Sequence, residues 1–198
     1  VPRSFLVSGV SGTNKAVKQA DTSFRLTKQV ADGLVDMQEV SKGLFLVQSE
    51  MSFKKETELC EEYPERKVFQ LSFCMNGICE WDYRQKRGEH YQLSPTQCSL
   101  QCGTFSQCIS RFGSEEPYRT LSISLEQERF LSLAEDLEAA HLIRRDNKIC
   151  THIFSTTPEI RLVLQQLLDC PPERKLRKLY LEGKVLELVS LFCEEAIG

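Results

Sequence analysis

Hydrophobic and polar residues alternate with a period of two through the middle of this chain, between about residues 44 and 125. The alternating runs are short, and they are separated by Gly, Pro and Asn residues that favour turns. No segment long enough for a parallel helical crossover interrupts them, so the strands are expected to be antiparallel. The pattern predicts an antiparallel barrel or sandwich with strands at 44–51, 68–74, 78–84, 98–102, 107–112 and 119–125.

The sequence CMNGIC at 74–79 predicts a hairpin, and the length of its loop determines which side chains share a face. A two-residue loop would place Phe73 beside Glu80, which mixes apolar with charged side chains. We therefore predict a three-residue loop in which Gly77 takes a left-handed conformation. The inward pairs are then Phe73 with Cys79, Leu71 with Trp81, and Phe69 with Tyr83, and the opposite face carries Gln70, Ser72, Glu80 and Asp82.

The inward face of this hairpin is the first candidate ligand-binding site. Its members are Trp81, Tyr83, Phe69, Leu71 and Phe73. Residues of this kind line ligand pockets in small barrels, and they also form ordinary cores. The sequence alone supports a pocket and a plain core about equally.

From about residue 125 the hydrophobic period changes to 3.6, which predicts helices. Ser124 and Gln127 fit a capping box, so one helix is expected to end near Ala140. The sequence TTPE predicts a second helix, with Thr157 as its cap and Pro158 at the first helical position. The predicted fold class is α+β, a β domain followed by an antiparallel helical pair.

A last helix follows the two prolines at 171 and 172, and it is apolar on two sides. The first stripe consists of Leu176, Leu179, Tyr180, Gly183, Leu186, Val189 and Cys193. The second stripe consists of Leu181, Val185, Leu188 and Phe192. Both apolar stripes of such a helix have to be buried, one against its own domain and the other against a second surface.

The chain divides into three parts by pattern. Residues 1–40 are polar and weakly patterned, and they are expected to form a flexible arm or linker. Residues 41–125 form the β domain, and residues 126–198 form the helical region.

Length and charge limit the classes of function. The 198 residues suffice for one sizeable domain, and 25 basic against 28 acidic side chains leave no broad positive field for phosphates. Direct binding of nucleic acid by these residues is therefore not expected. The sequence has no apolar run of membrane-spanning length and no signal-peptide pattern, so a soluble, cytoplasmic location without membrane attachment is expected.

Candidate catalytic groups are few. The three histidines, His90, His141 and His152, form no metal-binding pair in the sequence. Neither a phosphate-binding glycine loop nor a Gly-x-Ser-x-Gly nucleophile motif is present. We expect no catalysis, no cofactor and no metal; a small cupin-type enzyme is the less favoured alternative.

Nine cysteines are a high number for this length. Their number is odd and no Cys-x-x-Cys pair occurs, so neither a disulfide framework nor a zinc ribbon is indicated. Cys98 and Cys102 would share one face of a strand, with Cys108 on the next strand. These three thiols are an alternative site that would bind a soft metal or respond to oxidants, although buried structural thiols are the more common case.

Two segments resemble the amino-terminal regulatory domain of AraC-type transcription regulators, in particular the branch of the pyochelin siderophore regulator. They are EYPERKVFQLSFCMNGICEWDY at 62–83 and TPEIRLVLQQLLDCPPERKLRKLYLEGKVLELVSL at 157–191. The resemblance extends over roughly residues 40–198, and the second segment is the more specific part.

The resemblance implies a cupin-like barrel of jelly-roll type that binds an effector, and helices that form a homodimer. It also implies a DNA-binding domain with two helix-turn-helix units after residue 198. One stripe of the last helix would then pack on its own domain, and the second, Leu181, Val185, Leu188 and Phe192, would face a second protomer. The resemblance does not account for the nine cysteines, so it does not fix the identity of the effector. The alternatives are a ferric siderophore, another small molecule, and a metal or redox signal.

Overall fold

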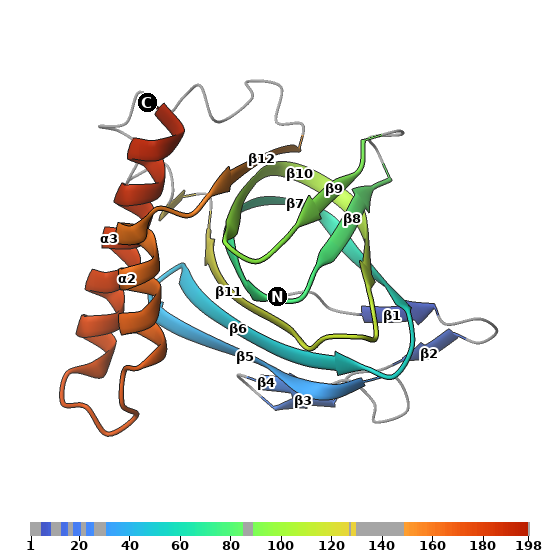
Figure 1. Cartoon of the computed structure of the whole chain (residues 1–198), viewed down its shortest axis with the longest axis horizontal. Helices are drawn as coiled ribbons and strands as arrows, with labels where there is room; N and C mark the ends of the chain where they lie inside the picture. Colours follow the sequence, from blue (N-terminus) through green and yellow to red (C-terminus); the bar gives the residue numbers. More distant parts are fainter. Residues whose placement is uncertain are drawn as a thin grey trace.

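The computed structural model describes residues 5–8, 13–15, 18–20, 23–25, 31–84, 89–126, 128–129 and 149–197. Within these residues, 12 strands belong to one sheet, and two helices pack beside it (Figure 1). The helices are α2 (Pro158–Leu168) and α3 (Arg177–Ile197). The strands are β1 (Phe5–Ser8), β2 (Thr13–Lys15), β3 (Lys18–Ala20), β4 (Ser23–Arg25), β5 (Ala31–Ser41), β6 (Leu44–Phe53), β7 (Thr57–Asn76), β8 (Cys79–Tyr83), β9 (Tyr91–Leu93), β10 (Gln97–Phe112), β11 (Tyr118–Leu125) and β12 (Cys150–Ser155).

Two long strands, β7 and β10, organise the sheet. They pair antiparallel along nearly their whole length. The other edge of β7 pairs with β11 and β1, and the other edge of β10 pairs with β12 and β8. The sheet curls around these strands (Figure 1), but its end strands β3 and β9 do not pair with each other. In the described part of the chain, the expected barrel is therefore an open, curled antiparallel sheet.

The predicted strands are found, with one merger. The segments 98–102 and 107–112 are parts of the single strand β10, which carries a bulge between Phe105 and Gln107. The bulge lets the strand continue while its inward-facing positions shift by one residue.

The first 40 residues differ from the expected arm. Residues 31–41 form β5, which pairs with β6, and β1 and β4 also join the sheet. Only Ala31, Val35 and Val40 are buried on β5, so its apolar pattern is too sparse to be recognised in the sequence.

The two faces of the curled sheet carry two separate cores, because successive side chains of a strand point to opposite faces. The outer face, on which Phe69, Leu71 and Phe73 lie, shares a core with α2 and α3, which lie outside the curl (Figure 1). The inner face carries a second core that includes Trp81 and Tyr83.

The second predicted helix is confirmed as α2. The hydroxyl of Thr157 accepts a hydrogen bond from the backbone N–H of Ile160 at 3.3 Å, and Pro158 begins the helix. The helix buries Ile160, Val163, Leu164 and Leu167. The helix expected from Ser124 to about Ala140 falls mostly on residues outside the described ranges.

The last predicted helix is confirmed as α3, but its second stripe does not face outward. Leu181, Val185 and Leu188 are 0% exposed and Phe192 is 1% exposed, in the core between the helices and the outer face of the sheet. This corrects the expectation that these four residues contact a second protomer, because their own domain already covers them. Among the described side chains of this region, the large apolar ones left exposed are Leu162 on α2, Leu176 just before α3, and Leu179 on α3.

Candidate ligand-binding site on the inner face of the sheet

The predicted hairpin between β7 and β8 is only half correct. Gly77 has a φ of +74°, as predicted, and a Cβ at this position would lie 2.9 Å from the carbonyl oxygen of Pro117. However, β8 pairs with β9 and β10 and not with β7. The reason is that β10 and β11 already occupy both edges of β7, so the chain crosses after Gly77 to another edge.

This crossing separates the residues of the first candidate site. Phe69, Leu71 and Phe73 lie on the outer face, in the core with the helices. Trp81 and Tyr83 lie on the inner face, where they are opposite Ser110 and Cys108 of β10. The prediction that Trp81 and Tyr83 are buried is confirmed, but the predicted pairs across the hairpin are wrong.

Trp81 and Tyr83 belong to an inner aromatic group. Tyr91 stacks on Trp81 at a centroid distance of 5.6 Å and lies edge-on to Tyr83 at 5.9 Å. Phe105 lies 5.1 Å from Tyr83. The sequence analysis did not select Tyr91 or Phe105, because β9 has only three residues and Phe105 lies between the two short strand segments that were predicted in place of β10.

Three buried polar atoms of this region lack a hydrogen-bond partner of normal geometry. They are the Nε1 atom of Trp81, the hydroxyl oxygen of Tyr83 and the Oγ1 atom of Thr151 on β12. Burial raises the pKa of Tyr83 well above its usual value, although hydrogen bonds with the side chains of Thr151 and Trp81 act in the opposite direction. The three groups therefore lie within reach of one another and form a small polar cluster whose hydrogen bonds are poorly aligned.

A row of serines crosses the same inner face. Ser99, Ser72 and Ser122 are in register across β10, β7 and β11. The hydroxyls of Ser72 and Ser122 are hydrogen-bonded at 2.9 Å, and the side-chain amide of Gln70 donates to Ser72 at 3.1 Å. Ser99 is fully buried, and its hydroxyl has no partner. The sequence analysis placed Gln70 and Ser72 on the face opposite Leu71 and Phe73, and it did not select Ser99 or Ser122.

The three thiols of the alternative site do not line one space. Cys98 and Cys102 lie on the outer face, and Cys108 lies on the inner face. Burial raises the pKa of Cys98 to about 12. Cys102 instead faces Cys150 of β12, which the sequence analysis did not select, with the two sulfur atoms 2.8 Å apart.

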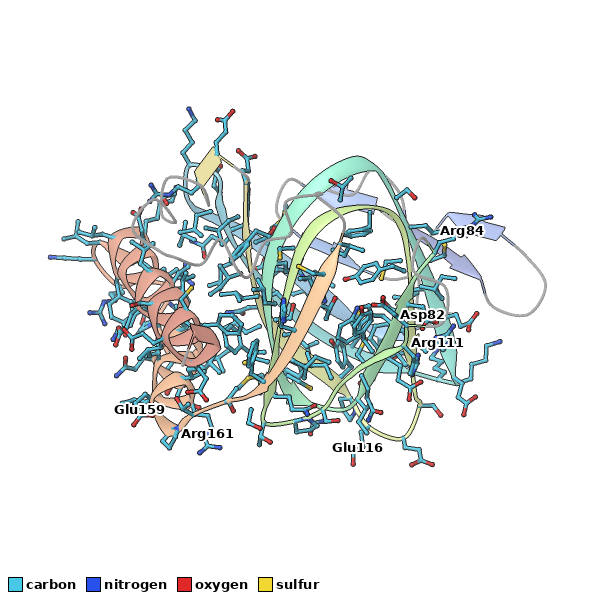
Figure 2. The ribbon with its side chains drawn as sticks, turned by 90° about the horizontal axis from the view of Figure 1, so that it is seen from above. Asp82, Arg84, Arg111, Glu116, Glu159 and Arg161 are labelled. Atoms are coloured by element: carbon cyan, nitrogen blue, oxygen red, sulfur yellow. The ribbon has the colours of Figure 1, made fainter. Side chains whose placement is uncertain are left out.

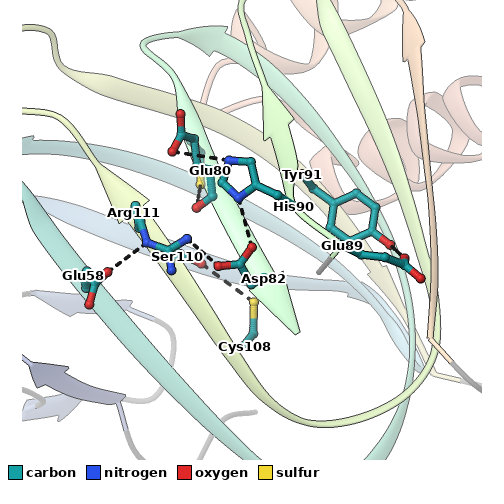
Figure 3. Close-up of polar contacts among 10 residues, drawn as sticks. Glu58, Glu80, Asp82, Glu89, His90, Tyr91, Cys108, Ser110 and Arg111 are labelled. Atoms are coloured by element: carbon teal, nitrogen blue, oxygen red, sulfur yellow. Dashed lines mark hydrogen bonds and ion pairs between the residues drawn. The ribbon is translucent and has the colours of Figure 1, made fainter. Parts of the chain in front are cut away.

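A group of charged side chains lies on the surface of β8 and β10 that faces away from Trp81 and Tyr83 (Figure 3). Arg111 bridges Glu58 and Asp82, and His90 lies between Asp82 and Glu80. Burial, the largest single influence, raises the pKa of Asp82, but the hydrogen bonds and charges of His90 and Arg111 together hold this pKa below its usual value. Figure 2 shows Asp82 and Arg111 together on the sheet, whereas Glu159 and Arg161 lie on α2.

In the described ranges, no group of three or more His, Cys, Asp or Glu side chains is placed to hold a metal ion. Among the same residues, no helix is long and apolar enough to cross a membrane.

Solved structures with a similar arrangement of sheet and helices include an AraC-like regulator and ToxT. The AraC-like transcriptional activator CuxR matches with a TM-score of 0.53 and 8% identity, over 88% of this chain and 60% of that chain. An apo variant of ToxT from Vibrio cholerae matches with a TM-score of 0.55 and 12% identity, over 80% of this chain and 58% of that chain. ToxT from the same organism bound to an unsaturated fatty acid matches with a TM-score of 0.50 and 12% identity, over 79% and 55% of the two chains. The chain thus spans about three fifths of the length of these proteins, and at such identities the likeness concerns the fold.

The sequence also matches a family model, described as the regulatory protein PchR N-terminal domain, over residues 32–197. The chain belongs to this family of regulator domains. No curated protein sequence matches it.

Proposed function

We propose that this chain is the effector-sensing part of an AraC-type transcription regulator, and that a small molecule binds on the inner face beside Trp81 and Tyr83. The family assignment supports a regulatory role without catalysis or a cofactor. In the full-length protein, which would act in the cytoplasm, a DNA-binding domain with two helix-turn-helix units is expected after residue 198.

The observation that carries the binding site is the polar cluster of Trp81, Tyr83 and Thr151, whose members lie together beside buried aromatic side chains and make no hydrogen bond of normal geometry. Buried polar groups in folded proteins are nearly always hydrogen-bonded, since each unsatisfied group costs free energy. A few polar groups beside an aromatic cluster are typical of a ligand-binding site, where a ligand would give these groups better-aligned hydrogen bonds than they give one another.

Strand β12 offers a route from this site to the helices. Thr151 belongs to the polar cluster with Tyr83 and Trp81, while Phe154 on the same strand contacts Phe192 of α3 at a centroid distance of 5.2 Å. Two residues after the strand ends, Thr157 caps α2. The strand and the helices would exist in two alternative arrangements. A ligand that forms a hydrogen bond with Thr151 would favour one position of β12, and with it one of the two packing arrangements of the helices.

The helices are also the proposed dimerisation unit. Since the stripe of Leu181 and Leu188 is covered by its own domain, the exposed side chains of Leu162, Leu176 and Leu179 are the remaining apolar surface for a second copy. Two dimer arrangements would then present the DNA-binding domains differently to adjacent half-sites.

A thermal melt with a ligand panel tests the proposed function. Ferric siderophores are the first candidates because of the family, and long-chain unsaturated fatty acids follow because ToxT was solved with one. A true effector raises the melting temperature, by the equivalent of about 2.7 kcal/mol at a hundredfold excess over Kd. It also changes the fluorescence of Trp81, the single tryptophan of the chain. Trp81→Phe should remove the optical signal and keep most of the thermal shift, and a panel without any shift would refute the proposal.

The pair Cys102 and Cys150 favours a second candidate, a redox sensor on the same fold. Their sulfur atoms are adjacent, and β12 connects the pair to the helices. A disulfide there would change the packing of β12 against β10, and its formation is tested by the first prediction below.

A further inference from the structure

Helix α3 presents a row of apolar and small residues to solvent. Leu179 is 64% exposed, Gly183 is exposed and Leu186 is half-buried. Spacings of four and three residues place these positions on one side of the helix. Leu176, which is 76% exposed, directly precedes the helix. We call these four residues the exposed face of α3.

Two residues of the exposed face lower the stability of a single domain. Gly183 stands inside a helix, where glycine is less favourable than alanine. Apart from the helix backbone around it, no atom of the described residues lies within 4 Å of a Cβ added there, so packing within this part of the domain does not require glycine. Leu176 has a φ of +56°, a left-handed conformation that disfavours residues with a Cβ. A second surface accounts for both features, because glycine lets another backbone approach closely and an exposed leucine is buried by such a contact.

The charges of α3 are ordered against the dipole of the helix. Exposed Lys175 and Lys178 lie at its N-terminal end, and exposed Glu187 and Glu194 lie in its C-terminal half. A helix dipole favours the reverse order, with anions near the N-terminus and cations near the C-terminus. The observed order is complementary to its own reversed copy, since an antiparallel helix brings glutamates to lysines. A parallel copy would place like charges together.

We infer that the exposed face of α3 packs against the same face of a second copy in antiparallel orientation, with Leu179 of each copy lying over Gly183 of the other. The same register brings Leu176 to Leu186 and Lys175 to Glu187 of the other copy. This inference rests on the proposed dimerisation, and it adds the orientation of the two helices and the residue at which they approach most closely.

Variants of Gly183 test the close approach. Sedimentation equilibrium of the 198-residue chain measures the dimer dissociation constant. Gly183→Ala should raise it about tenfold and Gly183→Leu should prevent the dimer, because each side chain fills the contact. In the background of Leu179→Glu, which charges the contact, Gly183→Ala should instead raise the melting temperature, because alanine favours the helix. Gly113→Ala is the matched control, since its added Cβ also meets open space, and it should leave the dimer unchanged.

Charge reversal tests the orientation. Lys175→Glu and Glu187→Lys should each weaken the dimer in low salt, and the double variant should restore most of the affinity. Glu187 also pairs with Lys184 of its own helix at 2.7 Å, so the restoration is the diagnostic result rather than either single loss. Glu116→Lys is the control for added charge, because Figure 2 places Glu116 on the sheet, away from α2 and α3.

The outcomes separate the inference from the proposed function. A dimer that tolerates Gly183→Leu, or a double charge variant without restored affinity, overturns the inferred packing and leaves dimerisation through another surface. A chain that stays monomeric at every concentration overturns both the packing and the proposed dimerisation. Effector sensing is decided separately, by the thermal shifts with the ligand panel.

Discussion

Cys102 and Cys150 face each other across the β10–β12 pair, and their sulfur atoms are 2.8 Å apart. Directly opposed residues of an antiparallel pair have Cα atoms about 4.5–5.5 Å apart, which is within the range that a disulfide spans. The neighbouring Cys150 thiol and burial both raise the pKa of Cys102, so little reactive thiolate exists at neutral pH.

We expect diamide to join these two cysteines slowly, with the two thiols losing two protons and two electrons to the reagent. The rate should increase as the pH rises, because the thiolate fraction increases. Mass spectrometry of unreduced peptides would detect the bridge. Cys102→Ser should abolish it, whereas Cys98→Ser, on the same face of the same strand, should not; a bridge that forms equally in both variants would exclude this pair.

Charging the buried side of α3 should unfold the domain rather than dissociate a dimer. Leu188 is fully buried, so Leu188→Glu places an unpaired charge in the core and is expected to cost several kcal/mol. The matched change Leu179→Glu lies on a side chain that is 64% exposed and should leave the fold intact.

Circular dichroism melts and size-exclusion chromatography compare the two variants. If the exposed helical side chains form the dimer, Leu179→Glu gives a folded monomer. A folded, monomeric Leu188→Glu protein would contradict the packing of α3 described above.

Replacing Gly77 should destabilise the connection between β7 and β8. Gly77→Ala requires a positive φ of an L-residue and brings a Cβ to within 2.9 Å of the Pro117 carbonyl. We expect a loss of about 1–3 kcal/mol, measured by urea denaturation. Gly113→Ala, where nothing lies within 4 Å of the added Cβ, is the control and should have little effect.

The ion pair between Arg111 and Asp82 should contribute to stability only above acidic pH. The folded-state pKa of Asp82 lies below its usual 3.8, so its contribution is complete at neutral pH and is lost as the pH falls through the folded-state value. Arg111→Met should therefore lower the melting temperature modestly at pH 7 in low salt. The difference from wild type should shrink below about pH 3.8 and in high salt, and an unchanged difference would indicate lost packing instead.

The 198-residue chain should not bind double-stranded DNA. Its 25 basic and 28 acidic side chains leave a formal net charge of -3, so the chain as a whole does not attract phosphates. A fluorescence anisotropy titration at moderate ionic strength should show no more binding than a neutral protein of similar size. Submicromolar, salt-dependent binding would place part of the DNA-binding surface within this chain.

Local sequence signals determined the elements where a residue's role depends on its near neighbours. The strand segments of β6 and β11, the cap of α2 at Thr157 and the left-handed Gly77 were all predicted correctly. Each depends on interactions within a few residues, such as alternating burial, a side-chain bond to a helix N–H, or the missing Cβ of glycine. The likeness to AraC-type regulators was also recognisable from the sequence, and the family match confirms it.

Only the tertiary structure decided which faces these elements present. β8 pairs with β10 because both edges of β7 are occupied, and no local signal in CMNGIC reports that occupancy. The change of partner moves Leu71 to the helices and leaves Trp81 on the inner face. Likewise, the two apolar stripes of α3 look alike along the chain, and the position of the sheet determines that Leu188 is buried while Leu179 is exposed. Strand pairing and helix docking join residues far apart in sequence, so their outcome depends on competition among all available edges and faces.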